Sequence, residues 1–121
     1  MKYILGKIEY FKGSTHLVHY DDDNVSIEHI YPQNPTDEWE LDEAKMQRFI
    51  FRLGNICLLE KNLNRVIQNV GFEKKLPVYQ KSSYYYAKKI SSDYTEWNDS
   101  SIIKLQTEMA NSAVSIWKVS I

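Results

Sequence analysis

An acidic residue and a histidine stand side by side at Glu28 and His29, where a short strand is expected to end. An imidazole with an unperturbed pKa of about 6.5 is often neutral at cellular pH and can take a proton from water. The carboxylate of Glu28 and the amide oxygen of Asn64 are hard oxygen ligands of the kind that suits Mg²⁺. Together these residue types could activate a water molecule and hold a divalent cation, which is the chemistry of phosphodiester hydrolysis.

A short strand should position the first pair, because apolar and polar residues alternate before Pro32, and proline cannot donate to a strand ladder. The alternation puts two sets of side chains on opposite faces, Val25, Ile27 and His29 on one and Ser26, Glu28 and Ile30 on the other. Glu28 and His29 can therefore serve one site only where the backbone leaves regular geometry. The segment Pro32–Pro35 supplies such a departure.

A second strand and a helix should position Asn64. Gly54-Asn55 is typical of a turn, the apolar run Ile56–Leu59 predicts a strand, and an amide-rich helix is expected to begin near Asn62. Gly54 suits the left-handed residue that commonly ends a helix. The expected order is therefore strand, strand, helix.

Four segments together resemble the ββα-metal (HNH) endonucleases, and more narrowly the C-terminal nuclease domain of GmrSD-type modification-dependent restriction proteins: Glu28–Asn34, Leu53–Lys61, Leu63–Arg65 and Phe72–Tyr79. The resemblance runs from about Tyr3 to Trp117. It implies an α+β fold in which a β-hairpin and a helix form a core embedded in a mainly helical domain. It also implies a DNA endonuclease acting in restriction of modified or phage DNA.

The resemblance assigns a role to each of four residues in this sequence. His29 is implied as the general base, Glu28 and Asn64 as metal ligands, and Asn55 as the residue that holds the hairpin and orients His29. Other branches of the family place a histidine where this chain has Asn64, so the expected cation is Mg²⁺ or Mn²⁺ in preference to Zn²⁺. Asn62 and Asn69 lie on the same segment and remain alternatives for the ligand position.

The formal net charge is −1, so the chain as a whole offers no field that would attract DNA, and phosphate contacts must be local. Lys61 and Arg65 are the best candidates because they flank the expected metal ligand. Lys74 and Lys75 continue the positive charge along the chain. DNA is thus the expected partner.

Composition limits the class of protein. The 121 residues suit a single domain spanning 1–121, with 43% hydrophobic and 26% charged residues. No apolar run approaches the roughly 20 residues that a bilayer span needs, and no secretory signal is present, so a cytoplasmic location without membrane contact is expected. The single cysteine, Cys57, excludes an intrachain disulfide and lies in an apolar strand, which favours a buried thiol.

The remaining elements are expected to be helical. The segment from about Lys2 to Lys12 is amphipathic and lacks an N-terminal cap, which, with the resemblance, suggests a C-terminal fragment that follows an N-terminal domain. Thr36 could cap a helix or turn leading into apolar residues at near-helical spacing, namely Trp39, Leu41, Ala44, Phe49, Ile50 and Leu53. Further helices are expected over Phe72–Tyr79, Tyr84–Ile90 and from Asn98 or Asp99 to about Lys118. Pro77 fits such a helix only in its first turn or at a kink.

Three alternatives stay open from the sequence alone. His16 and His19, in an expected extended segment, could be metal ligands, although their surroundings disfavour that. Tyr84–Tyr86 could stack on bases, although packing is expected for at least two of them. Glu28 and His29 could be a surface acid beside a core-edge histidine, in which case the chain would be a non-cleaving nucleic-acid or protein interaction module.

Overall fold

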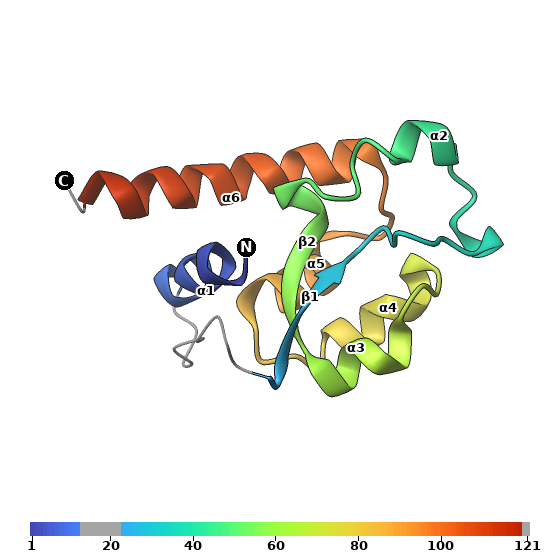
Figure 1. The fold of residues 1–121 in the computed structure, drawn as a ribbon, viewed down its shortest axis with the longest axis horizontal. Coiled ribbons are helices and arrows are strands. Elements are labelled where there is room, and N and C mark those ends of the chain that lie inside the picture. The colour runs from blue at the N-terminus through green and yellow to red at the C-terminus, as the bar shows by residue number, and fades with distance from the viewer. Residues whose placement is uncertain (13–22, 120–121) are drawn as a thin grey trace.

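The computed structural model describes residues 1–12 and 23–119, with side chains described as far as residue 115. Within these residues the strands form one antiparallel hairpin, and helices pack around it (Figure 1). The predicted α+β class with a mainly helical surround is confirmed. The segment predicted as extended at 16–20, which includes His16 and His19, lies outside the described residues.

The hairpin consists of β1 (Val25–His29) and β2 (Ile56–Glu60), paired so that His29 lies opposite Ile56. Four of the five residues of β2 are buried, as expected of an apolar strand covered on both faces. Burial along β1 does not follow hydrophobicity, because Glu28 is 2% exposed while Ile27 is only partly buried. A charged residue therefore points into the interior at the end of the first strand.

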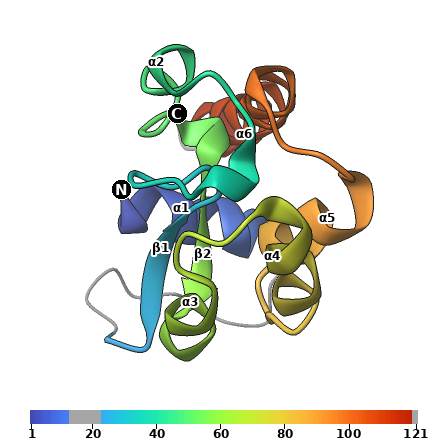
Figure 2. The ribbon, with the colours of Figure 1, turned by 90° about the vertical axis from the view of Figure 1, so that its right-hand side faces the viewer.

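Two short helices lie at the far end of β2. The first, α3 (Lys61–Ile67), begins directly after the strand, so the predicted order of strand, strand, helix is confirmed. The second, α4 (Phe72–Tyr79), lies beside α3 (Figure 2). Pro77 stands in the second turn of α4, not the first, so α4 lacks the hydrogen bond that an N–H at this position would donate to the carbonyl of Glu73.

The segment between the strands is not one continuous helix. It contains the 3₁₀ helix η1 (Asp37–Trp39), the short helix α2 (Glu43–Met46) and the 3₁₀ helix η2 (Leu53–Asn55). Thr36 does not cap η1 with its side chain, since its Oγ1 donates to Asn69 O (3.4 Å). The cap of α2 is Asp42, whose side chain accepts from Lys45 N (3.3 Å).

Glycine is required at position 54 for a different reason from the one that the sequence suggested. Its φ lies outside the left-handed region, and the residue sits in η2 against the last helix, α6 (Asp99–Val119). A Cβ at this position would lie 2.0 Å from Ile102 O and 2.7 Å from Gln106 Cβ. Glycine is therefore required for the close approach of η2 to α6.

A buried carboxylate joins the N-terminal helix to the middle of the chain. α1 (Lys2–Phe11) carries Glu9, 1% exposed, whose oxygens accept from Tyr85 N (2.6 Å) and Tyr86 N (2.9 Å). Those amides open α5 (Tyr85–Asp93), where a negative charge satisfies unpaired N–H groups and the helix dipole. The expected helices at both positions are confirmed.

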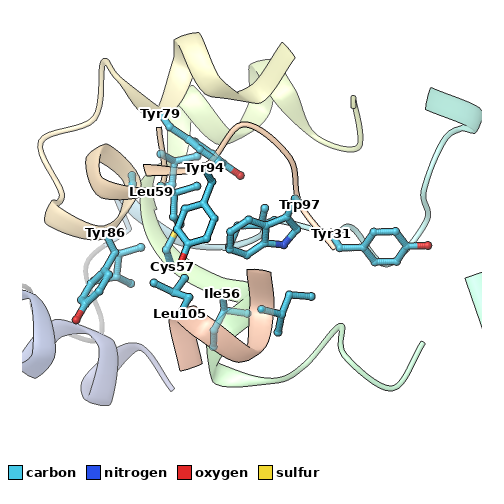
Figure 3. Close-up of a cluster of buried hydrophobic side chains, with 14 of the residues drawn as sticks. Tyr31, Ile56, Cys57, Leu59, Tyr79, Tyr86, Tyr94, Trp97 and Leu105 are labelled. Carbon is cyan, nitrogen blue, oxygen red and sulfur yellow. The ribbon is translucent and has the colours of Figure 1, made fainter. Parts of the chain in front are cut away.

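The core lies between β2, α5 and α6 (Figure 3). Cys57 is buried there as predicted, and desolvation by burial raises the pKa of its thiol well above the ordinary value. Tyr84 and Tyr86 are buried as well, which confirms that at least two of the three tyrosines pack in the interior. Among the described helices, none combines the length and apolar composition that crossing a bilayer requires.

Candidate active site

A cavity of about 360 Å³ opens where β1 ends beside α3. It brings together the three residues expected to do chemistry: Glu28 and His29 from the end of β1, and Asn64 from α3. Amide side chains form much of the rest of its wall; the lining residues are Ile27, Glu28, His29, Pro32, Gln33, Asn34, Asn64, Gln68 and Asn69. Asn62 is exposed and is not part of this lining, so of the amides first considered Asn64 and Asn69 reach the cavity.

Asn64 is held by a chain of hydrogen bonds across the hairpin. Its Nδ2 donates to Ser26 Oγ (2.8 Å), and Ser26 Oγ donates to Leu59 O (3.1 Å). Because the amide nitrogen is bound to β1, the orientation of the amide oxygen is fixed as well. The sequence alone did not identify Ser26 as a site residue. The alternating pattern of the predicted strand placed Ser26 on one face but indicated no partner for its hydroxyl group.

His29 lies half-buried at the end of β1 with its ring against Phe51, edge to face at a centroid separation of 5.5 Å. Burial lowers the pKa of the imidazole below its ordinary value, and the positive charge of Lys75 lowers it further. Both effects favour the neutral ring. A neutral imidazole is the form that can accept a proton.

Glu28 is bound from α4. Lys75 Nζ donates to Glu28 Oε2 (2.9 Å) and Tyr79 OH donates to the same oxygen (2.6 Å), with both donors 0% exposed. Burial raises the pKa of the Glu28 carboxyl, and the charge of Lys75 and the two hydrogen bonds oppose that rise. Burial likewise lowers the pKa of Lys75, against the attraction of Glu28. Each group thus favours the charged form of the other.

Lys75 also fixes the backbone that carries His29. Its Nζ donates to His29 O (3.0 Å) and Ile30 O (2.9 Å), so α4 is tied to the chain where it leaves β1. The sequence suggested Lys75 as a phosphate contact, but this geometry leaves it no surface for DNA. The sequence did contain an indication that Lys75 is buried, because its spacing places it on the same face of the helix as Phe72 and Tyr79.

Asn55 does not line the cavity but secures the loop that follows His29. Its Oδ1 accepts from Tyr31 N (2.9 Å) and Trp97 Nε1 (2.9 Å), and its Nδ2 donates to Tyr31 O (2.9 Å) and Ile50 O (3.0 Å). Its backbone oxygen accepts from Ile30 N (2.9 Å). The side chain is 0% exposed and is fully used by these contacts.

We expect Asn55→Ala to lower the free energy of unfolding by about 2 to 3 kcal/mol, because buried donors on Tyr31 and Trp97 lose their acceptor. Activity should fall together with the melting temperature, since the loop after His29 loosens. Thermal melting and cleavage assays on the same preparation check this. Asn62→Ala, at an exposed amide outside the cavity, is the matched control and should leave both unchanged. A normal melting curve with lost cleavage would show that Asn55 takes part directly.

The other predicted phosphate contacts lie on the surface. Lys61 and Arg65 are exposed on α3 on either side of Asn64 in the sequence. Lys74 is exposed on α4 and forms an ion pair with Glu38 (Nζ to Oε2, 2.8 Å). None of the three belongs to the cavity lining, so they stand outside it.

The donor set of the cavity suits a hard cation. It offers one carboxylate, from Glu28, and amide oxygens, of which that of Asn64 is oriented by Ser26. Within the described residues, no group of three or more histidine, cysteine, aspartate or glutamate side chains could hold a metal. One carboxylate with amide oxygens matches Mg²⁺, which keeps several waters and takes phosphate oxygens into its shell.

Comparison with known families gives a match to the one described as GmrSD restriction endonucleases, C-terminal domain, over residues 1–112. No curated protein matches the chain. The matched range includes both strands and all the residues that line the cavity.

Proposed function

Since the chain belongs to the C-terminal domain family of the GmrSD restriction endonucleases, we propose that it is a metal-dependent HNH-type nuclease domain that hydrolyses phosphodiester bonds in DNA. The observation that carries this proposal is the shared cavity of Glu28, His29 and Asn64. A neutral imidazole, a carboxylate and an oriented amide lie around one space large enough for a phosphate and water molecules.

His29 acts as the general base in this proposal. Its lowered pKa keeps the ring neutral, and it takes a proton from the water that attacks the phosphorus atom. The hydrogen bonds of Lys75 to the backbone carbonyls of His29 and Ile30 fix the main chain that carries the imidazole and leave its ring nitrogens unused. Asn55 supports the same stretch of chain through its two side-chain hydrogen bonds with the backbone of Tyr31.

Glu28 and Asn64 would hold Mg²⁺ or Mn²⁺ at the cavity. The bound cation supplies positive charge to the phosphate oxygens and to the leaving oxygen. Lys75 and Tyr79 fix the carboxylate of Glu28 through Oε2, and Ser26 fixes the amide of Asn64 through Nδ2. Both oxygen donors are therefore positioned before a ligand arrives, which limits the reorganisation needed on binding.

DNA would be held outside the cavity by the exposed cations of α3, Lys61 and Arg65. Because these are few and the net charge is −1, binding should be weak and should fall as salt rises. Backbone contacts carry no sequence information, so we propose that the N-terminal domain of the same protein recognises the modified DNA.

Incubation of plasmid DNA with the purified chain tests the proposal. We expect cleavage with Mg²⁺ or Mn²⁺, none with EDTA, and cleavage slowed by at least about 10²-fold for His29→Ala under the same conditions. Phe51→Leu, which keeps an apolar side chain beside the imidazole, is the matched control and should still cleave. Binding of DNA without any cleavage in either metal would instead support a non-cleaving interaction module.

A further inference from the structure

Gln68 stands out in the described residues because its backbone is strained. It ends α3 with φ 33° and ψ −104°. Glu40 is the other described non-glycine residue with positive φ, but its φ 43° and ψ 34° fall close to the ordinary left-handed region. The conformation of Gln68 lies outside that region, where glycine is far less costly than any other residue.

Contacts on both sides impose this conformation. Gln68 N donates to Asn64 O (3.0 Å), which closes the last turn of α3. The next residue, Asn69, is bound across the loop: its Nδ2 donates to Asn34 O (2.9 Å), and its backbone oxygen accepts from Trp39 Nε1 (3.2 Å). The chain must therefore reverse sharply at Gln68.

The side chain of Gln68 makes no polar contact that would stabilise the described fold. It is exposed, and its carboxamide has no hydrogen-bond partner among the residues that the structure describes. It does line the cavity, one helical turn beyond Asn64. A glutamine in a strained conformation, with an exposed carboxamide that lines the cavity and makes no hydrogen bond to the described residues, is best explained by a ligand.

We propose that Gln68 is a substrate-contacting residue, whose carboxamide hydrogen-bonds a nucleotide next to the scissile phosphate. This deepens the proposed nuclease function and rests on it. A carboxamide can donate and accept at once, which suits base edges and sugar oxygens. Being neutral, it releases no counterion, so its contribution to DNA affinity does not depend on salt.

The variant Gln68→Gly distinguishes the effect of the strained backbone on stability from the effect of the carboxamide on DNA binding. Glycine relieves the strained conformation, so the melting temperature should rise by at least about 2 °C. Loss of the carboxamide should weaken DNA binding about 3- to 10-fold, the range expected for one net hydrogen bond. KM should rise with kcat nearly unchanged, because proton transfer by His29 does not involve Gln68.

The controls use the same chain. Glu40→Gly, at the other positive φ and outside the cavity, should leave the DNA dissociation constant and KM at parent values. Arg65→Ala should weaken binding as well, but should also lower the slope of log K against log salt by about 0.9. Gln68→Gly should leave that slope unchanged. Fluorescence anisotropy with a labelled duplex in EDTA gives the dissociation constants without cleavage.

A parent-like dissociation constant for Gln68→Gly overturns the inference, and so does an unchanged or lower melting temperature. Plasmid cleavage by the parent chain tests the proposed nuclease function separately. If the parent chain fails to cleave plasmid DNA in Mg²⁺ or Mn²⁺, the nuclease proposal fails, whereas a weaker duplex complex of Gln68→Gly in EDTA would still establish the contact.

Discussion

His29→Ala should lose about 10²- to 10⁴-fold in cleavage rate, the usual contribution of a general base, while its affinities for metal and DNA stay nearly the same. The reason is that neither binding step uses the imidazole. Its pKa is lowered by burial and by Lys75, so the ring is poised to accept a proton. Plasmid cleavage, calorimetric metal titration and duplex anisotropy on the variant check the three parts.

The metal ligands should respond differently. Asn64→Ala removes a proposed oxygen ligand, and Glu28→Gln replaces the charged carboxylate by a neutral carboxamide that holds a cation more weakly, so metal affinity and rate should fall together, and extra Mg²⁺ or Mn²⁺ should restore part of the activity. Glutamine is the better choice at Glu28, because it still accepts the hydrogen bonds of Lys75 and Tyr79. Asn62→Ala, on the same helix but outside the cavity, is the matched control.

Two results would change the assignment. If His29→Ala loses metal as severely as Glu28→Gln, then His29 is a ligand and the base must be another residue, with His19 the first to examine. If the variants of His29, Glu28 and Asn64 all cleave like the parent, the nuclease assignment fails.

Lys75→Met should lower the free energy of unfolding by about 3 to 5 kcal/mol, the usual result of removing one partner from a buried ion pair. The Lys75 side chain is 0% exposed, and its loss leaves Glu28 Oε2 and two backbone oxygens without their shared donor. Denaturant unfolding of parent and variant measures the difference.

Lys74→Met is the matched control, since Lys74 is the neighbouring lysine on α4 but is 66% exposed at the surface. The denaturant midpoint of Lys74→Met should hardly change, because a surface ion pair adds little to the free energy of unfolding. The double variant Glu28→Gln/Lys75→Met should be more stable than Lys75→Met alone, since no uncompensated charge stays buried. Equal losses for the two lysine variants would show that the buried pair is not what stabilises this end of β1.

The sequence alone determined the elements that depend on local signals. Pro32 and the alternation before it predicted the end of the first strand, and the apolar run Ile56–Leu59 predicted the second. Of the two residues expected to start α6, Asn98 is the cap, as shown by reciprocal hydrogen bonds from Ser101 N to Asn98 Oδ1 (3.2 Å) and from Asn98 N to Ser101 Oγ (3.2 Å). Such features are fixed by neighbours in the chain, which a sequence displays directly.

Residue types and motif spacing also indicated the three side chains that share the cavity. The resemblance to the HNH endonucleases, which those residue types and their spacing carry, named Glu28, His29 and Asn64; the acid and the histidine alone would have favoured a surface acid beside a core-edge histidine. Their mutual orientation was not visible, because Ser26, which holds Asn64, lies 38 residues away in the chain.

Only the tertiary structure decided the places where distant segments meet. A lysine is normally exposed. Lys75 can be buried because its ammonium group pairs with Glu28 and donates hydrogen bonds to two carbonyl oxygens of another segment. Gly54 is needed because α6 passes so close to it, and the segment between the strands, whose apolar residues have near-helical spacing, forms separate short helices joined by turns. Hydrophobicity and spacing report what one segment prefers, whereas a buried charge or a close backbone contact depends on what the rest of the chain brings to it.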